Sequence, residues 1–129
     1  MITLTDYFGR MSHQFQPEPE VVSNAQVLLE RVNALLAELQ WKPNVNSGWR
    51  SAAYNALVPN AAPKSKHITG QAIDLSDPEG ELDQLLFDNQ QYLIKHQLWL
   101  EHPLATKARS YLHHHTFQAA SPSFQSSLA

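Results

Sequence analysis

The stretch 65–75, Ser-Lys-His-Ile-Thr-Gly-Gln-Ala-Ile-Asp-Leu, constrains the fold of this chain more than any other part of the sequence. His67 and Asp74 are the two residues in it that can bind a transition metal. Gly70 between them indicates a turn, and residues 72–75 are typical of a short buried strand. Because a turn followed by a strand can bring both side chains to one point, the stretch predicts two of the three protein ligands of a catalytic zinc site.

The third ligand must come from another part of the chain. The sequence contains no cysteine, so any metal has to be held by histidine and carboxylate side chains. Residues 111–115, Tyr-Leu-His-His-His, are typical of a strand that carries imidazoles. Side chains alternate between the two faces of a strand, so we expect His113 and His115 on one face and His114 on the other. His114 is then not expected to share a metal with His113, and the residues alone leave His113 and His115 as alternatives.

Length and composition exclude several classes of protein. A chain of 129 residues is predicted to form a single domain over residues 1–129, with one hydrophobic core. Its net charge of −3 lacks the basic excess of a nucleic-acid binder, so no nucleic-acid partner is expected. The sequence shows neither a signal peptide nor a membrane-spanning run, so we expect a cytoplasmic product without a membrane span. We also expect a monomer.

Helical patterns occur in three places. Between residues 20 and 40, apolar residues recur at steps of three and four, which predicts an amphipathic helix. A shorter helix is predicted over residues 52–57, with Ser51 as its N-cap. A third is predicted to begin with Asp77 as N-cap and Pro78 as first helical residue. The apolar residues of the first helix are Ala25, Leu28, Leu29, Val32, Leu35, Leu36 and Leu39.

Strand patterns complete the predicted architecture. Residues 98–100 and 111–117 are expected to form strands beside the one at 72–75. Residues 1–19 and 119–129 lack a regular pattern and are expected to be a loosely ordered leader and tail. These elements predict an α+β fold, in which helices pack on one side of a small, mainly antiparallel sheet and a groove on the sheet carries the metal site.

Four segments of the chain resemble the M15 family of zinc D,D-carboxypeptidases and peptidoglycan endopeptidases, particularly its short single-domain members from phages and prophages. The family pattern Ser-x-His-x-x-Gly-x-Ala-x-Asp is filled by the stretch 65–74, and its aromatic-aliphatic-His strand by residues 111–113. Residues 47–51, Ser-Gly-Trp-Arg-Ser, are similar to the family's Ser-Gly-Tyr-Arg-Ser. Residues 98–107 also resemble the phage members.

This resemblance implies a fold shared by Hedgehog and D,D-peptidase domains and a zinc ion held by His67, Asp74 and His113. It places Arg50 facing the metal, where a guanidinium binds a substrate carboxylate or stabilises the oxyanion of the reaction. Ser65 is expected to contact substrate or orient His67, and His115 to line the cleft or donate to substrate.

The proton-transferring group is harder to assign. In many relatives an acidic residue stands three positions before the last histidine ligand, where this chain has Ser110. Glu101 is the best substitute, because the phage members that residues 98–103 resemble also have a glutamate there. An ion-paired charge at the end of a strand is the alternative for Glu101. Asp77 and Asp83 are weaker candidates, since Asp77 is better explained as a helix cap.

The function implied is zinc-dependent hydrolysis of the peptide stems of bacterial peptidoglycan, by a D,D-carboxypeptidase or endopeptidase of the phage endolysin kind. Such a protein would act on the cell wall after release or assembly into a particle. The alternative is a non-catalytic zinc-containing structural or binding module of a phage particle, and a more remote one is a signalling-type relative that binds zinc without hydrolysis.

Overall fold

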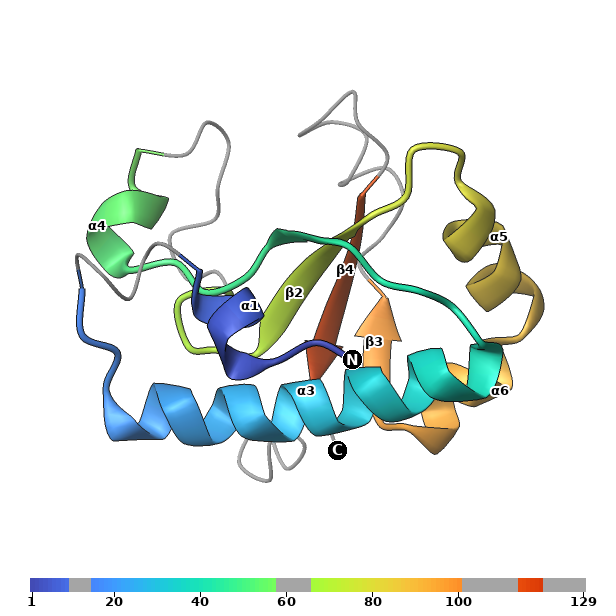
Figure 1. Cartoon of the computed structure of the whole chain (residues 1–129), viewed down its shortest axis with the longest axis horizontal. Helices are drawn as coiled ribbons and strands as arrows, with labels where there is room; N and C mark the ends of the chain where they lie inside the picture. Colours follow the sequence, from blue (N-terminus) through green and yellow to red (C-terminus); the bar gives the residue numbers. More distant parts are fainter. Residues whose placement is uncertain (10–14, 58–65, 101–113, 120–129) are drawn as a thin grey trace.

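The computed structural model describes residues 1–9, 15–57, 66–100 and 114–119, with the side chains of residues 1–9, 15–57 and 66–99 (Figure 1). Its elements follow the order α1 (Leu4–Phe8), α3 (Pro19–Leu39), β1 (Val45–Ser47), α4 (Ala52–Asn55), β2 (Ala72–Ser76), α5 (Glu81–Asp88), α6 (Gln90–Lys95), β3 (Leu98–Leu100) and β4 (His114–Ala119).

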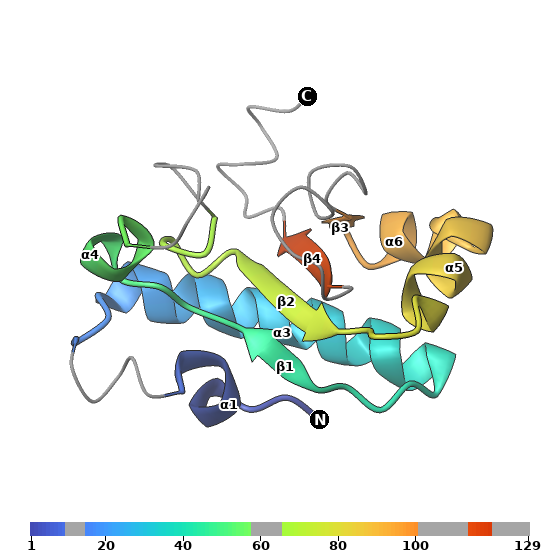
Figure 2. The ribbon, with the colours of Figure 1, turned by 90° about the horizontal axis from the view of Figure 1, so that it is seen from above.

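The strands form one four-stranded sheet in the order β1-β2-β4-β3. All three pairings are antiparallel. The long helix α3 lies against one face of this sheet, α5 and α6 gather at one end, and α4 lies at the other end (Figures 1 and 2). The predicted α+β class is therefore confirmed.

Helix α3 forms where the three- and four-residue apolar pattern predicted it. Pro19 occupies its first turn, where a missing amide proton costs nothing, and Gln40 ends it in the left-handed conformation with φ 56°. The apolar stripe is buried and packs on Ile73 and Leu75 of β2, which are fully buried. Alternate residues of β2 thus face α3 and belong to the core. Asp74, which lies between Ile73 and Leu75, belongs to the opposite face of the sheet.

The first nine residues are not the loosely ordered leader that the sequence suggested. They form α1, whose N-cap Thr3 accepts from the Asp6 amide while the Asp6 carboxylate accepts from the Thr3 amide. This capping box closes the first turn. Ile2, Tyr7 and Phe8 are buried in the core, so burial of apolar area adds to the local caps. Residues 120–129 of the predicted tail lie outside the described residues.

The helix expected to begin at Pro78 begins instead at Glu81, after Gly80 in the left-handed conformation, and a break at Asn89 separates α5 from α6. Asp77 nevertheless caps it. Its carboxylate accepts from the amides of Leu82 at 3.1 Å and Asp83 at 2.9 Å. The capping residue was therefore predicted correctly. It lies three positions further from the helix than expected, because residues 78–80 form a turn between Asp77 and α5.

Strand β1 is not among the predicted strands, since residues 44–48 are rich in turn-forming residues. Pairing with β2 makes it a strand: Val45 lies opposite Leu75 and Ser47 opposite Asp74, with a bulge between the two pairs. Helix α4, capped by the Ser51 hydroxyl as predicted, follows shortly after. Strands β2 and β3 confirm the predicted strands, and β4 overlaps the predicted 111–117.

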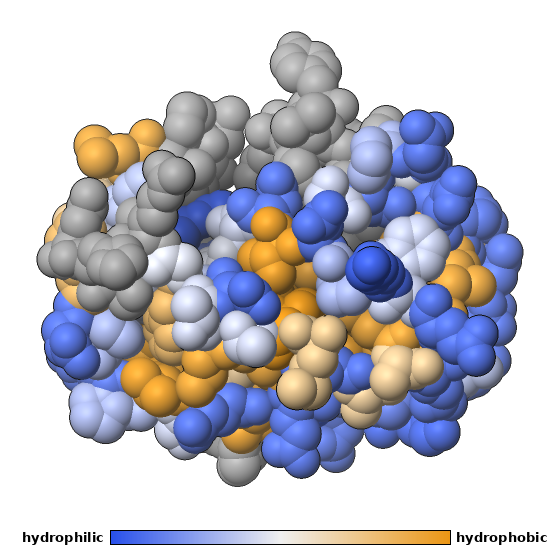
Figure 3. Space-filling model, in the orientation of Figure 1, coloured by the Kyte–Doolittle hydropathy of each residue, from blue (hydrophilic) through white to orange (hydrophobic). Residues whose placement is uncertain are grey.

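Apolar residues gather in the middle of the face shown in Figure 3, with hydrophilic residues around them. Within the described ranges, none of the helices has the length and apolar character needed to cross a membrane.

Candidate metal centre

His67 and Asp74 converge as the sequence predicted. His67 lies in the turn before β2, Asp74 in the middle of that strand, and Nε2 of the histidine is 3.3 Å from Oδ2 of the aspartate. Both residues are buried, with His67 only 3% exposed. A turn and the strand that follows it therefore hold one nitrogen and one oxygen at a single point.

The other ring nitrogen of His67 determines what Nε2 can do. Nδ1 lies 2.7 Å from the carbonyl oxygen of Gly48, which can only accept a hydrogen bond. Nδ1 must therefore carry a proton and donate it. In the neutral imidazole Nε2 is then a lone-pair acceptor that faces the acceptor Oδ2 of Asp74. A cation between these two atoms, either a proton or a metal ion, is what makes the arrangement favourable.

The pair fits a zinc ion. Nitrogen and oxygen ligands about 2.0–2.2 Å from a tetrahedral zinc lie roughly 3.3–3.6 Å from each other, and the observed separation is 3.3 Å. Metal-binding histidines almost always donate their other ring N–H to a carboxylate, a backbone carbonyl or water, and the bond from Nδ1 of His67 to the Gly48 carbonyl is of this kind. The donor set and its orientation therefore match the metal that the sequence predicted.

Arg50 lies beside this pair, as expected. Its NH2 group is 3.7 Å from Oδ2 of Asp74, and its NH1 group donates to Oδ1 of Asn55 at 3.4 Å. The side chain is mostly buried, with 12% of its surface exposed. Asn55 in α4 thus helps to aim the guanidinium at the site, so Arg50 adds a fixed positive charge there.

The segment that carries Gly48 and Arg50 is held from two sides. On one side the Trp49 amide donates to the Tyr7 carbonyl at 3.2 Å. On the other, the Arg50 amide donates to the His67 carbonyl at 3.1 Å, and the Trp49 indole to that of Ile68 at 2.9 Å. These bonds connect the end of β1 directly to the turn that carries His67.

Glycine is required where this segment passes α1. A Cβ at position 48 would collide with the carbonyl oxygen of Tyr7. The Tyr7 hydroxyl in turn donates to the carbonyl oxygen of Ala72, at the start of β2, at 2.7 Å. Tyr7 therefore supports both halves of the site, and burial raises the pKa of its phenol.

Sequence reasoning missed Tyr7, although a signal was present. Thr3 is followed three residues later by Asp6, a capping pattern that indicates a helix start, and the apolar pair Tyr7 and Phe8 comes next. A short helix with two buried aromatic residues could therefore have been predicted at the N-terminus.

The turn before β2 is fixed by helix α3. Gly70 has φ +77°, and a Cβ there would lie 2.6 Å from the carbonyl oxygen of Val21. Asn24 of the same helix donates to the Thr69 carbonyl at 3.0 Å. The predicted turn at Gly70 is confirmed, and the close approach of α3 explains why glycine occupies it.

Three residues of the predicted site, Ser65, Glu101 and His113, lie outside the described residues, and so does Ser110, which stands where many relatives have an acidic residue. Across the part of the chain that the structure does describe, His, Asp and Glu side chains form no group of three that could hold a metal ion. His115 lies in β4, opposite Leu75 of β2. Asp77 and Asp83, the weaker candidates for proton transfer, meet at the start of α5, where the Asp77 carboxylate accepts from the Asp83 amide.

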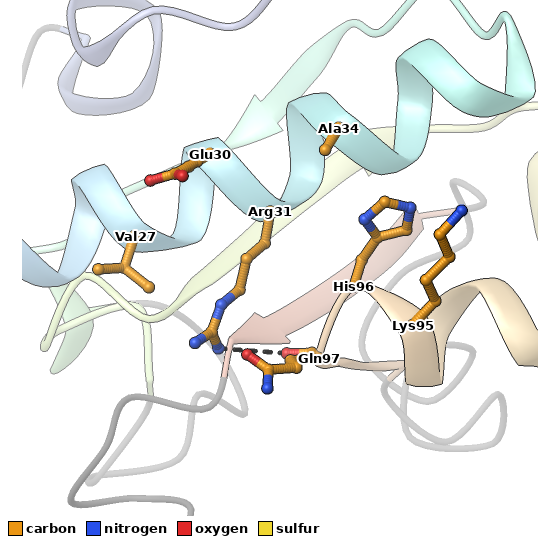
Figure 4. Close-up of a pocket in the computed structure, with 7 residues that line it drawn as sticks. All are labelled: Val27, Glu30, Arg31, Ala34, Lys95, His96 and Gln97. Carbon is orange, nitrogen blue, oxygen red and sulfur yellow. Dashed lines mark hydrogen bonds between the residues drawn. The ribbon is translucent and has the colours of Figure 1, made fainter.

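A second polar region lies between α3 and the turn from α6 to β3 (Figure 4). There Arg31 donates to the Gln97 carbonyl at 3.3 Å. Nearby, Lys95 and His96 both contact Glu38 at 2.8 Å, and the hydrogen bond from Lys95 lowers the pKa of Glu38. The contact of His96 with Glu38 explains this histidine as a hydrogen-bond partner at the surface. The pocket is lined by Val27, Glu30, Arg31, Ala34, Lys95, His96 and Gln97.

Comparison with known proteins agrees with this geometry. The model of the family Peptidase M15 matches residues 7–102, and the chain belongs to this family of peptidases. The match begins at Tyr7 and includes Arg50, His67 and Asp74. Searches among curated proteins and among solved structures found no match. The family consists of hydrolytic peptidases that act on peptidoglycan and are generally zinc-dependent.

Proposed function

We propose that this protein is a zinc metallopeptidase that cuts peptide stems of bacterial peptidoglycan, as a D,D-carboxypeptidase or endopeptidase of the phage type. The observation that carries the proposal is the pair of buried acceptors, His67 Nε2 and Asp74 Oδ2, held 3.3 Å apart beside Arg50. Membership of the M15 family supports it.

His67 and Asp74 would hold the zinc together with a third ligand from the histidine triplet, for which the family resemblance implies His113. When bound, zinc supplies a Lewis acid that lowers the pKa of a water molecule and polarises a carbonyl group. The Gly48 carbonyl keeps Nδ1 of His67 protonated, so that Nε2 is directed to the metal.

Arg50 would bind the substrate. Its guanidinium lies within 3.7 Å of Asp74, so a substrate carboxylate or a developing oxyanion near the metal comes within reach of its donors. Two charge-assisted hydrogen bonds from a planar guanidinium also fix the orientation of the group that they bind. This role suits an enzyme whose substrates end in, or carry, carboxylates close to the cut.

Glu101 is our candidate for moving the proton from the attacking water to the leaving amine. It directly follows β3, an edge strand of the sheet beside β4. A carboxylate in this role must reach both the water and the amine nitrogen. Ser65 and His115 remain candidates for contacts with the peptide.

Incubation of the purified full-length chain with peptidoglycan sacculi tests this function. Release of stem peptides or of free D-alanine is expected, with new amino termini that identify the bond. A chelator should abolish the release, and zinc in slight excess should restore it. If the zinc-loaded protein binds sacculi but releases nothing, the peptidase function is wrong and a binding module is favoured.

A further inference from the structure

Trp99 in the edge strand β3 has 39% of its surface exposed, whereas its neighbour Leu98 is 4% exposed and belongs to the core. Side chains alternate between the two faces of a strand, so these two residues belong to opposite faces of the sheet. The core face is the one that packs on α3. Trp99 therefore belongs to the other face, where its large indole ring reaches solvent.

The pairing of the strands places Trp99 on the same face as Asp74. Trp99 lies opposite Gln118 of β4, and Gln118 in turn lies opposite Ala72 of β2. Residues directly opposite each other share a face, and Ala72 is two positions from Asp74 in the same strand. The exposed ring and the candidate metal centre thus occupy one face of the sheet.

The spacing of the strands sets the distance between the two positions. Strand β4 lies between β2 and β3, so two strand spacings of about 4.8 Å each separate Ala72 from Trp99 (Figures 1 and 2). Two residues along β2 add about 7 Å. The Cα atoms of Asp74 and Trp99 are then roughly 12 Å apart, a span that an extended peptide covers with three to four residues. A peptide whose reacting bond lies at the metal centre therefore comes within reach of Trp99.

The two ends of this span offer different contacts. Arg50 supplies a fixed positive charge beside Asp74, whereas the indole of Trp99 supplies a flat apolar surface. A side chain such as that of lysine covers an apolar surface with its methylene groups and leaves its ammonium group in water. Stem peptides of peptidoglycan contain a diamino acid of this kind, with a long aliphatic side chain that carries an amine.

We propose that Trp99 is a substrate-binding residue that packs against the aliphatic side chain of the diamino acid in the stem peptide. The inference rests on the proposed function and extends it, because it names a part of the substrate that is recognised away from the reacting bond. This contact is the same before and during the reaction, so it stabilises the bound substrate and the transition state equally. Loss of the ring should therefore raise KM and leave kcat unchanged.

Kinetics of the zinc-loaded chain on two stem peptides, one with lysine and one with alanine in its place, test this inference. For the lysine peptide, the KM of Trp99→Ala should rise roughly 10-fold, the equivalent of about two buried methylene groups. For the alanine peptide, parent and variant should have the same KM, because no long side chain packs on the ring. A merely structural role of Trp99 would affect both peptides equally, and that result overturns the inference.

Two further variants sharpen the comparison. Trp99→Phe keeps an aromatic ring and should show a smaller rise in KM than Trp99→Ala. Phe87→Ala is the matched control, because Phe87 is 65% exposed but lies in α5 and not on the sheet. Its KM should equal that of the parent for both peptides. An unchanged KM in Trp99→Ala, or an equal rise in Phe87→Ala, also overturns the inference.

Failure of the proposed function is distinguishable from failure of this inference. If the parent binds the lysine peptide without cutting it, the peptidase function is wrong, and the same comparison is made with Kd values from calorimetry. A Kd that rises in Trp99→Ala for the lysine peptide alone then supports the role of Trp99, and equal Kd values overturn it. A parent that neither cuts nor binds either peptide overturns both.

Discussion

The carbonyl oxygen of Gly48 accepts a hydrogen bond from Nδ1 of His67 across 2.7 Å. The two residues come from different segments, the end of β1 and the turn before β2. Because a carbonyl can only accept, this one contact fixes the tautomer of the histidine and turns Nε2 toward Asp74. The position of a backbone atom in one segment thus orients the atom of another segment that we propose to bind the metal.

Gly48→Ala should disturb this relationship. Its Cβ would collide with the Tyr7 carbonyl, so the segment must shift and move the Gly48 carbonyl away from His67. We expect a loss of about 1–3 kcal/mol in the free energy of unfolding, the usual cost of overpacking, together with weaker zinc binding. Chemical denaturation and metal competition measure the two effects.

Gly80→Ala is the matched control for this substitution. Gly80 has φ +71°, but among the described residues no atom beyond its chain neighbours lies within 4 Å of a Cβ built there. Only the strain of the left-handed conformation, about 1–2 kcal/mol, should appear, with zinc affinity unchanged. Weaker zinc binding in Gly80→Ala but not in Gly48→Ala would refute the role given to the Gly48 carbonyl.

The variant Tyr7→Phe should separate two contributions of Tyr7 to stability, namely its hydrogen bond and the ionisation of its phenol. Burial raises the pKa of Tyr7, so above its ordinary pKa of about 10 the unfolded chain ionises first and the folded state loses stability as the pH rises. The variant should lose about 0.5–1.5 kcal/mol at neutral pH, through the bond to Ala72, but show a smaller alkaline decline than the parent.

Denaturant titrations at neutral pH and at about pH 11 measure both parts of this prediction. Tyr54→Phe serves as the control, because Tyr54 is 43% exposed. It should keep the alkaline decline of the parent. An equal decline in Tyr7→Phe and the parent would mean that ionisation of Tyr7 does not limit stability at high pH.

The sequence predicted which residues converge at the candidate site, but not the contacts that hold these residues in place. His67, Asp74 and Arg50 stand in local patterns that can be read in a single stretch each, and the apolar period of α3 is long enough to be unambiguous. Strand β1 was missed because its residues favour turns and only pairing with β2 makes it a strand. The contact of Tyr7 with Ala72 joins residues 65 positions apart, a separation that no local pattern reports.

The register of the sheet also could not be predicted from local sequence patterns. Alternation along residues 113–115 separates His114 from its neighbours but does not say which set shares a face with Asp74. That depends on which residue of β4 lies opposite Asp74, and the observed partner is Thr116. A shift of one residue would exchange the two faces.

Arg50→Ala should lower turnover while leaving zinc content near that of the parent. The guanidinium lies 3.7 Å from Asp74, and in the proposed mechanism it binds substrate beside the metal without being a ligand. The defect should be larger for substrates with a carboxylate near the cut and partly repaired by added guanidinium.

Arg31→Ala is the control for charge, because its guanidinium donates to Gln97 in the separate pocket of Figure 4. Its turnover should match that of the parent. Equal losses in the two arginine variants would indicate a general effect of charge and argue against a specific role for Arg50.

Glu101→Gln tests the proposed proton transfer. The amide keeps the size of the side chain but cannot take up the proton, so turnover should fall by roughly 10²–10⁴-fold with zinc content preserved. Asp88→Asn, at the end of α5, should stay close to the parent in rate. Turnover of Glu101→Gln near the parental rate would remove this residue from the mechanism.

The most direct test of the whole account is the zinc content of the purified chain, measured by elemental analysis after dialysis without chelator. The parent should hold one zinc ion per chain, and His67→Ala and Asp74→Asn should each lose it, since we propose both residues of the pair as ligands. His96→Ala, which removes a surface histidine paired with Glu38, should retain it. A parent without zinc, or a His67→Ala variant that keeps its zinc, would contradict the account.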